Sequence, residues 1–213
     1  MTRHARSERL LLCDALERLG PDAPTLCEGW ATRDLAAHLV IRESRPDLAV
    51  GIRVPALAGR LEREQRREAD GDYPALVARL RAGAPNWNPL SIGVFDELAN
   101  LVEFFVHHED VLRAQPTWAP RHLSAALERQ LWAALRRLAR LTFRKARTGI
   151  VLVAPGVGRH SARLPDTHGT VIVRGAPAEL VLFAHGRGAQ TAVTLEGDAD
   201  DVAALVADWP GPA

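Results

Sequence analysis

The sequence predicts an α+β protein: an N-terminal antiparallel helical bundle followed by a small α+β domain. Over the first two-thirds of the chain, apolar residues recur at spacings of three and four, which is typical of amphipathic helices. The segments between them are short, which favours antiparallel neighbours. From about residue 149 onward, short β-branched runs bounded by Gly, Pro and Asp indicate strands instead. We therefore place the bundle at 1–147 and the small domain at 148–213.

The first helices of the bundle follow from the residues that begin and end them. A helix over 6–19 ends at Gly20 and Pro21. Thr32 is a good N-cap for a helix over 33–44, and Asp34 in its first turn suits the positive end of the helix dipole. Further helices are expected over 56–68 and 73–82, and a rigid loop at 85–89 has proline at both ends.

Two longer helices complete the bundle, and mixed elements follow. The first runs over 93–114 and ends before Pro116, and the second spans 121–145 with leucines in helical register. Strands are expected at 150–153, 170–173 and 191–195. Pro177 at a first helical position predicts a helix over 177–184, and a final short helix covers 200–206.

Composition narrows the class of protein. The formal net charge is +1, whereas a dedicated nucleic-acid binder needs a basic excess, so we expect no nucleic-acid partner. The basic run from Arg136 to Arg147 is interpreted as the solvated face of a helix. Two cysteines, Cys13 and Cys27, suit a reducing compartment. Neither a signal peptide nor a membrane span is evident, so we expect a cytoplasmic protein without a membrane partner.

The strongest chemical signal is a carboxylate and an imidazole on adjacent helical turns. Glu103 and His107 are four residues apart, so they share one face of the predicted helix. His38 supplies a third ligand if it faces the same cavity. Two histidines and one carboxylate leave coordination positions open, as in catalytic zinc sites, and they also suit Fe(II) or Ni(II). The alternatives are a salt bridge from Glu103 to an arginine of another helix and a hydrogen bond between His38 and either Asp34 or the backbone.

Neighbouring polar residues are candidates for supporting these ligands. Metal-bound histidines usually donate their second N–H to a carboxylate, so we expect Asp34 or Asp110 to take that part. His108 points about 100° away from His107 on a helix, and we expect it either to cap or to hydrogen-bond Asp110 or Glu109.

Other side chains have two open interpretations each. Cys27 is either a reactive thiol of lowered pKa or an idle small residue, and Trp30 is either a core anchor or a wall of the site. Arg113 and Arg187 are either anion-binding forks or surface arginines. Three histidines without ligand spacing are interpreted as surface residues: His160, His168 and His185.

Two motifs carry a family resemblance. Residues 30–39 read Trp-Ala-Thr-Arg-Asp-Leu-Ala-Ala-His-Leu, and residues 103–110 read Glu-Phe-Phe-Val-His-His-Glu-Asp. They resemble the DinB-like metal-binding four-helix bundles and, more narrowly, the mycothiol-dependent maleylpyruvate isomerase family, in an actinobacterial subgroup distinct from the isomerase itself. The late family signature, Gly-x-Pro-x-x-Leu followed by Gly-Arg, is similar to residues 175–180 and 186–187.

The resemblance implies a set of roles. Zinc would be held by His38, Glu103 and His107, mycothiol would be the thiol cofactor, and Arg187 would be the catalytic arginine of the C-terminal domain. The expected function is a zinc-dependent transferase or isomerase that joins a small thiol to a small electrophile. The alternative is a non-catalytic metal- or ligand-binding protein of stress response or sequestration. Neither the electrophile nor the oligomeric state follows from the sequence.

Overall fold

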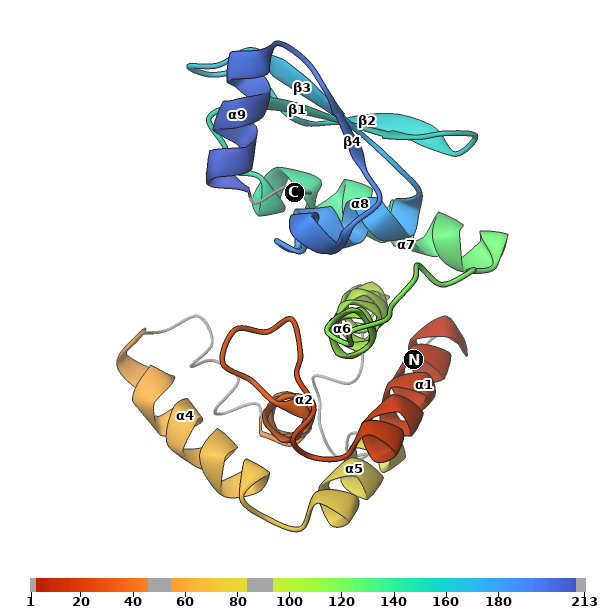
Figure 1. The fold of residues 1–213 in the computed structure, drawn as a ribbon, viewed down its shortest axis with the longest axis vertical. Coiled ribbons are helices and arrows are strands. Elements are labelled where there is room, and N and C mark those ends of the chain that lie inside the picture. The colour runs from red at the N-terminus through yellow and green to blue at the C-terminus, as the bar shows by residue number, and fades with distance from the viewer. Residues whose placement is uncertain (1–2, 46–54, 84–93, 210–213) are drawn as a thin grey trace. The chain divides into compact units, whose positions relative to one another are not determined.

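The computed structural model describes residues 3–45, 55–83 and 94–209, and the predicted loop at 85–89 lies outside them. The chain divides into two compact units, Met1–Ala119 and Pro120–Ala213, each described here by itself (Figure 1). Helices precede a mixed sheet, so the predicted α+β class is confirmed. In the described part of the chain, no helix is long and apolar enough to cross a membrane.

The elements described in the first unit are helices joined by loops. They are α1 (Arg3–Leu19), α2 (Thr32–Ser44), α4 (Pro55–Ala69), α5 (Tyr73–Ala82) and α6 (Val94–Arg113). Helix α1 packs on α5 and α6, while α2 packs on α4 and α5. Their apolar faces meet in one core that includes Leu12, Leu16, Leu35, Leu39 and Phe104. The bundle therefore holds α2 and α6, the two helices that carry the predicted ligands, in fixed positions.

The loop between α1 and α2 is tied down by hydrogen bonds. The Thr32 hydroxyl donates to the carbonyl of Gly20, so the predicted N-cap role of Thr32 is wrong. Ala31 occupies the N-cap position, and its N–H donates to the Asp34 carboxylate at 2.9 Å. Asp34 thus satisfies an N–H at the start of α2, where a negative charge is favourable. This ordering fixes both the start of α2 and the loop before it.

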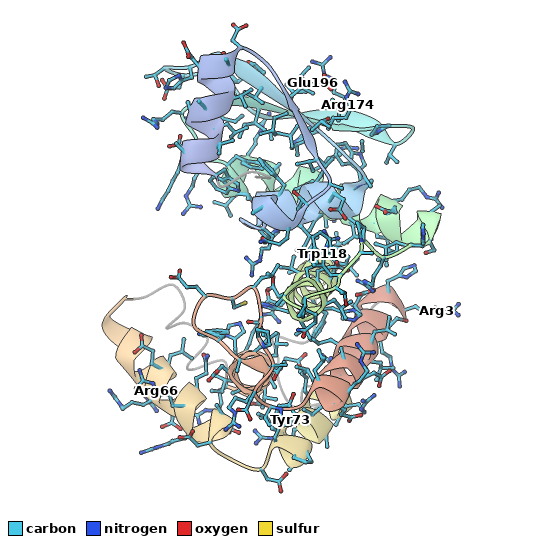
Figure 2. All side chains as sticks on the ribbon, in the orientation of Figure 1. Arg3, Arg66, Tyr73, Trp118, Arg174 and Glu196 are labelled. Carbon is cyan, nitrogen blue, oxygen red and sulfur yellow. The ribbon has the colours of Figure 1, made fainter. Side chains whose placement is uncertain are left out.

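The second unit combines three α-helices, over its described residues, with a four-stranded sheet. Its elements are α7 (Ala125–Thr142), β1 (Gly149–Ala154), β2 (Gly158–Arg163), β3 (Thr170–Arg174), α8 (Pro177–Ala184), β4 (Thr194–Glu196) and α9 (Ala199–Asp208). The strand order is β2-β1-β3-β4; β1 and β3 run parallel, and the two outer pairs are antiparallel. Arg174 of β3 and Glu196 of the outer strand β4 form an exposed ion pair between these two neighbouring strands (Figure 2).

Strand β2 was not expected from the sequence. It reads Gly-Arg-His-Ser-Ala-Arg, without a β-branched residue, and its pairing with β1 supplies the order that propensity does not. Strand β4 begins later than the predicted 191–195, because Gly188–Gln190 form a 3₁₀ turn that the Thr191 hydroxyl closes by donating to Gly188 O.

Helix α7 packs with the sheet unit. It contacts α8 and β2, and Phe143 at its C-terminal end stacks near Phe183 and Trp209. Ser124 caps its N-terminus by accepting from Leu127 N–H. The sequence-based division at 147/148 assigned this helix to the bundle, because periodicity shows which face is apolar and not which partner covers it.

Candidate metal centre

In the first unit, two histidine side chains approach the same carboxylate oxygen of a glutamate. His38 lies on α2, and Glu103 and His107 lie one turn apart on α6. His38 Nε2 is 3.5 Å from Glu103 Oε1, and His107 Nε2 is 3.4 Å from the same oxygen. The two imidazole rings meet edge to face, with centroids 5.6 Å apart. The structure thus brings together all three residues predicted as ligands.

The separations of the two imidazole nitrogens from the Glu103 oxygen fit a single metal ion. Two donors bonded to zinc at about 2.0–2.1 Å in a tetrahedral arrangement are about 3.4 Å apart. The observed separations of 3.4 and 3.5 Å match that edge length. The set of two imidazole nitrogens and one carboxylate oxygen is also one that zinc accepts.

The three side chains are partly exposed. The side chains of His38, Glu103 and His107 are 15%, 27% and 13% exposed. This candidate group comprises three donors among the described residues. Three protein donors with partial exposure leave room for water or another small molecule, which is typical of catalytic and not of structural zinc.

Asp110 holds the His107 ring. His107 Nδ1 lies 3.0 Å from Asp110 Oδ2, and Asp110 is fully buried. A carboxylate accepts from Nδ1–H, so the lone pair of neutral imidazole is left on Nε2, the atom that faces Glu103. Burial would lower the pKa of His107, but its contacts with Asp110, Cys27 and Glu103 raise it well above the usual value. Of the two predicted supporting carboxylates, Asp110 contacts the candidate ligand His107, while Asp34 accepts from its own helix start.

Arg42 is a site residue that the sequence reasoning missed. Its Nε is 3.3 Å from Glu103 Oε1, and its Nη1 donates to Asn100 Oδ1 at 2.8 Å. Burial would raise the pKa of Glu103, but His107, His38 and the charge of Arg42 lower it well below the usual value. The alternative of a salt bridge is therefore present beside the imidazole contacts. Arg42 stands one turn after His38 on α2, which is the spacing that should have identified it.

Cys27 lies on the far side of His107 from Glu103. Its thiol donates to Asp110 Oδ2 at 3.2 Å, and its Sγ is 3.9 Å from His107 Nδ1. Cys27, His107 and Asp110 therefore form a second possible donor group that shares one histidine with the first. We favour the first group, because His107 and Asp110 are at direct hydrogen-bond distance and already satisfy each other.

Two expected neighbours have other partners. His108 Nδ1 pairs with Glu8 of α1 at 3.1 Å, both buried, so the predicted bond to Glu109 or Asp110 is wrong. Arg113 is buried, bonds to Glu109 and lies over the Trp118 ring, so it is a packed residue and not an anion fork.

The remaining candidates are placed as follows. The Trp30 ring contacts that of His38 at 5.1 Å between centroids and also packs on the bundle core. Arg187 lies in the second unit, at the turn between α8 and the 3₁₀ segment, where its guanidinium donates to His185 O. Its catalytic role stays a prediction.

Comparison with solved structures identifies the fold. The chain is similar to the mycothiol-dependent maleylpyruvate isomerase, with a TM-score of 0.61 and 19% identity, and to a histidine-to-alanine mutant of that enzyme, with a TM-score of 0.63 and 19% identity. Each match covers 93% of this chain and 92% of the other. No protein-family model and no curated protein matches the sequence.

Proposed function

We propose that His38, Glu103 and His107 hold one divalent metal ion, preferably zinc, and that the protein is a small-thiol-dependent transferase or isomerase. The observation that carries the proposal is the placement of both imidazole Nε2 atoms at 3.4–3.5 Å from one Glu103 oxygen. The fold supports the thiol part, since the isomerase that shares it is mycothiol-dependent. Mycothiol or a similar small thiol is therefore the proposed cofactor, and a small electrophile the substrate.

A divalent ion held by these three residues would supply positive charge that favours the thiolate over the thiol. The protein side chains would orient the ligands, balance charge and bind anionic groups. Asp110 keeps the Nε2 lone pair of His107 available, and Glu103 brings a negative charge that offsets part of the charge of the metal. Arg42, beside Glu103, offers a guanidinium to an anionic group of the thiol or electrophile.

Arg187 is the proposed anion-binding arginine of the second unit. Its planar guanidinium can donate two parallel hydrogen bonds to one carboxylate, which the ammonium group of lysine cannot do. Arg187→Ala should lower thiol-dependent turnover without loss of metal, since all three proposed ligands lie in the first unit. Arg187→Lys should restore little of that turnover. Loss of metal in Arg187→Ala, or full activity in it, would contradict this role.

The experiment combines metal loading with a conjugation screen. Metal-free and zinc-loaded protein are each incubated with mycothiol, or with a surrogate thiol, and with a panel of electrophiles containing an activated alkene, an epoxide and an alkyl halide. We expect zinc-dependent thiol consumption that is lost in His38→Ala and kept in Asp34→Asn, whose carboxylate serves only the helix start. Absence of turnover across the panel in fully loaded protein would favour the alternative, a metal-binding protein without catalysis.

A further inference from the structure

A basic cluster in the second unit is not used by the proposed function. It is formed where the second half of α7 runs beside the edge strand β2. From Arg129 to Arg147 the sequence contains seven arginines and lysines and no acidic residue. Arg136 and Arg140 are one turn apart on α7, and both are exposed.

An irregularity in β2 brings another arginine to this cluster. Ile150 pairs with Arg163, but Val151 pairs with Ser161, so Ala162 is an extra residue in the strand. Such a bulge redirects the side chains that follow it. Because Ile150 pairs with Arg163 and Leu152 pairs with His160, both polar residues lie on the sheet face of the fully buried Ile150 and Leu152. Arg163 then reaches the end of α7 and donates to Ala146 O at 3.1 Å.

A cavity opens at this junction. Its volume is about 480 Å³, and it is lined by Arg140 and by residues 161–166. This volume lies in the range of small-molecule pockets, about 300–1,000 Å³. Two guanidiniums, the Ser161 hydroxyl and the Asp166 carboxylate are its charged and polar groups.

Charges within the unit do not neutralise the cluster. The C-terminal end of a helix carries only about half a negative charge. Arg147 is paired with Asp208, but among the described residues neither Arg136 nor Arg140 has an ion-pair partner. Asp166, 62% exposed, is 3.7 Å from Arg163 and offsets one charge. An excess of positive charge remains beside the cavity.

His160, which precedes the cavity residue Ser161 in β2, has a ring nitrogen without a partner. His160 Nε2 is buried, and no described group accepts from it or donates to it. A buried polar atom without a partner is costly, and it often indicates an absent ligand or water. Burial, followed by the charges of Arg136 and Arg140, lowers the pKa of His160.

We infer that the cavity between α7 and β2 binds the phosphate dianion of a small phosphate monoester. Arg140 and Arg163 would hold the oxygens by charge-assisted hydrogen bonds, with Ser161 as a further donor. A doubly charged oxyanion matches the excess of cations better than a single carboxylate does. The site lies wholly in the second unit and is independent of the metal centre.

Calorimetric titration of the full chain at fixed ionic strength tests the inference. The probes are inorganic phosphate and glycerol 3-phosphate, and malonate is the non-phosphate dianion. We expect one saturable site per chain for the phosphate probes, weaker binding of malonate, and a shift of the His160 ring proton resonances on saturation. Phosphatidylcholine vesicles containing phosphatidic acid distinguish a lipid headgroup from a soluble ester; binding to vesicles alone would overturn the soluble ligand.

Matched arginine variants test the placement of the site. Arg140→Ala should weaken phosphate binding at least about tenfold, because a charge-assisted bond is lost, and Arg140→Lys should recover little of it. Arg137→Ala removes the same charge from the same helix, outside the cavity lining, and should change affinity less than about twofold. Equal losses in Arg137→Ala and Arg140→Ala would show diffuse surface charge only. No saturable binding of either phosphate probe would also overturn the site.

Discussion

Replacing Asp110 with asparagine tests how the His107 ring is held. The substitution keeps the size of the side chain but removes the charge that accepts from His107 Nδ1 at 3.0 Å. A hydrogen bond to a charged group is worth about 1–1.5 kcal/mol more than a neutral one, which corresponds to roughly tenfold in metal affinity. If the amide turns its NH₂ toward Nδ1, the ring proton moves to Nε2, and the loss approaches about 100-fold.

The assay is a competition between the protein and a chromophoric zinc chelator at constant pH. Asp34→Asn is the matched control, because it makes the same chemical change at a carboxylate that accepts from Ala31 N–H at the start of α2. The control should cost about 0.5–1 kcal/mol of folding stability and leave zinc affinity within about twofold. Unchanged zinc affinity in Asp110→Asn, or an equal loss in Asp34→Asn, would refute the role assigned to Asp110.

Three further predictions use charges and pKa values of the first unit. Arg42→Gln should tighten zinc binding several-fold in the same competition assay, because a cation 3.3 Å from the Glu103 oxygen is removed; weaker binding would contradict this. Zinc affinity should fall as pH falls, since the raised pKa of metal-free His107 means that binding must displace a proton; a pH-independent affinity would count against it. Burial raises the pKa of Cys13 from 9.0 to about 11. The thiol of the unfolded chain therefore ionises first, and denaturant titrations should show that about 2–3 kcal/mol of folding stability is lost as the pH rises between these two pKa values. Cys13→Ala should lack that loss.

The grouping of His38, Glu103 and His107 could be predicted because its main signal is local, and their role as metal ligands stays a prediction. Glu103 and His107 share a helical face by spacing alone, and a carboxylate among apolar neighbours requires a partner. His38 was placed by the motif around it, whereas its distance from Glu103 depends on how α2 packs beside α6. The fold class followed from the sequence pattern, which changes near residue 149 from apolar residues at helical spacing to short β-branched runs.

Contacts between distant residues that no motif marks could not be predicted from the sequence. Cys27 and Asp110 are 83 positions apart, and only the ordered loop before α2 brings them together. His108 finds Glu8 on α1, a partner 100 positions away, because the α1–α6 interface buries both. Strand β2 has no β-branched residue, so its order depends on pairing with β1.

Metal stoichiometry in three variants tests the central claim most directly. His107 belongs to both possible donor groups, so its removal cannot distinguish them, whereas His38 and Glu103 belong to one and Cys27 to the other. Elemental analysis of the intact protein should give about one zinc per chain, little or none in His38→Ala and Glu103→Gln, and an undiminished amount in Cys27→Ser. Zinc retained in His38→Ala and lost in Cys27→Ser would contradict the account and move the metal to Cys27, His107 and Asp110.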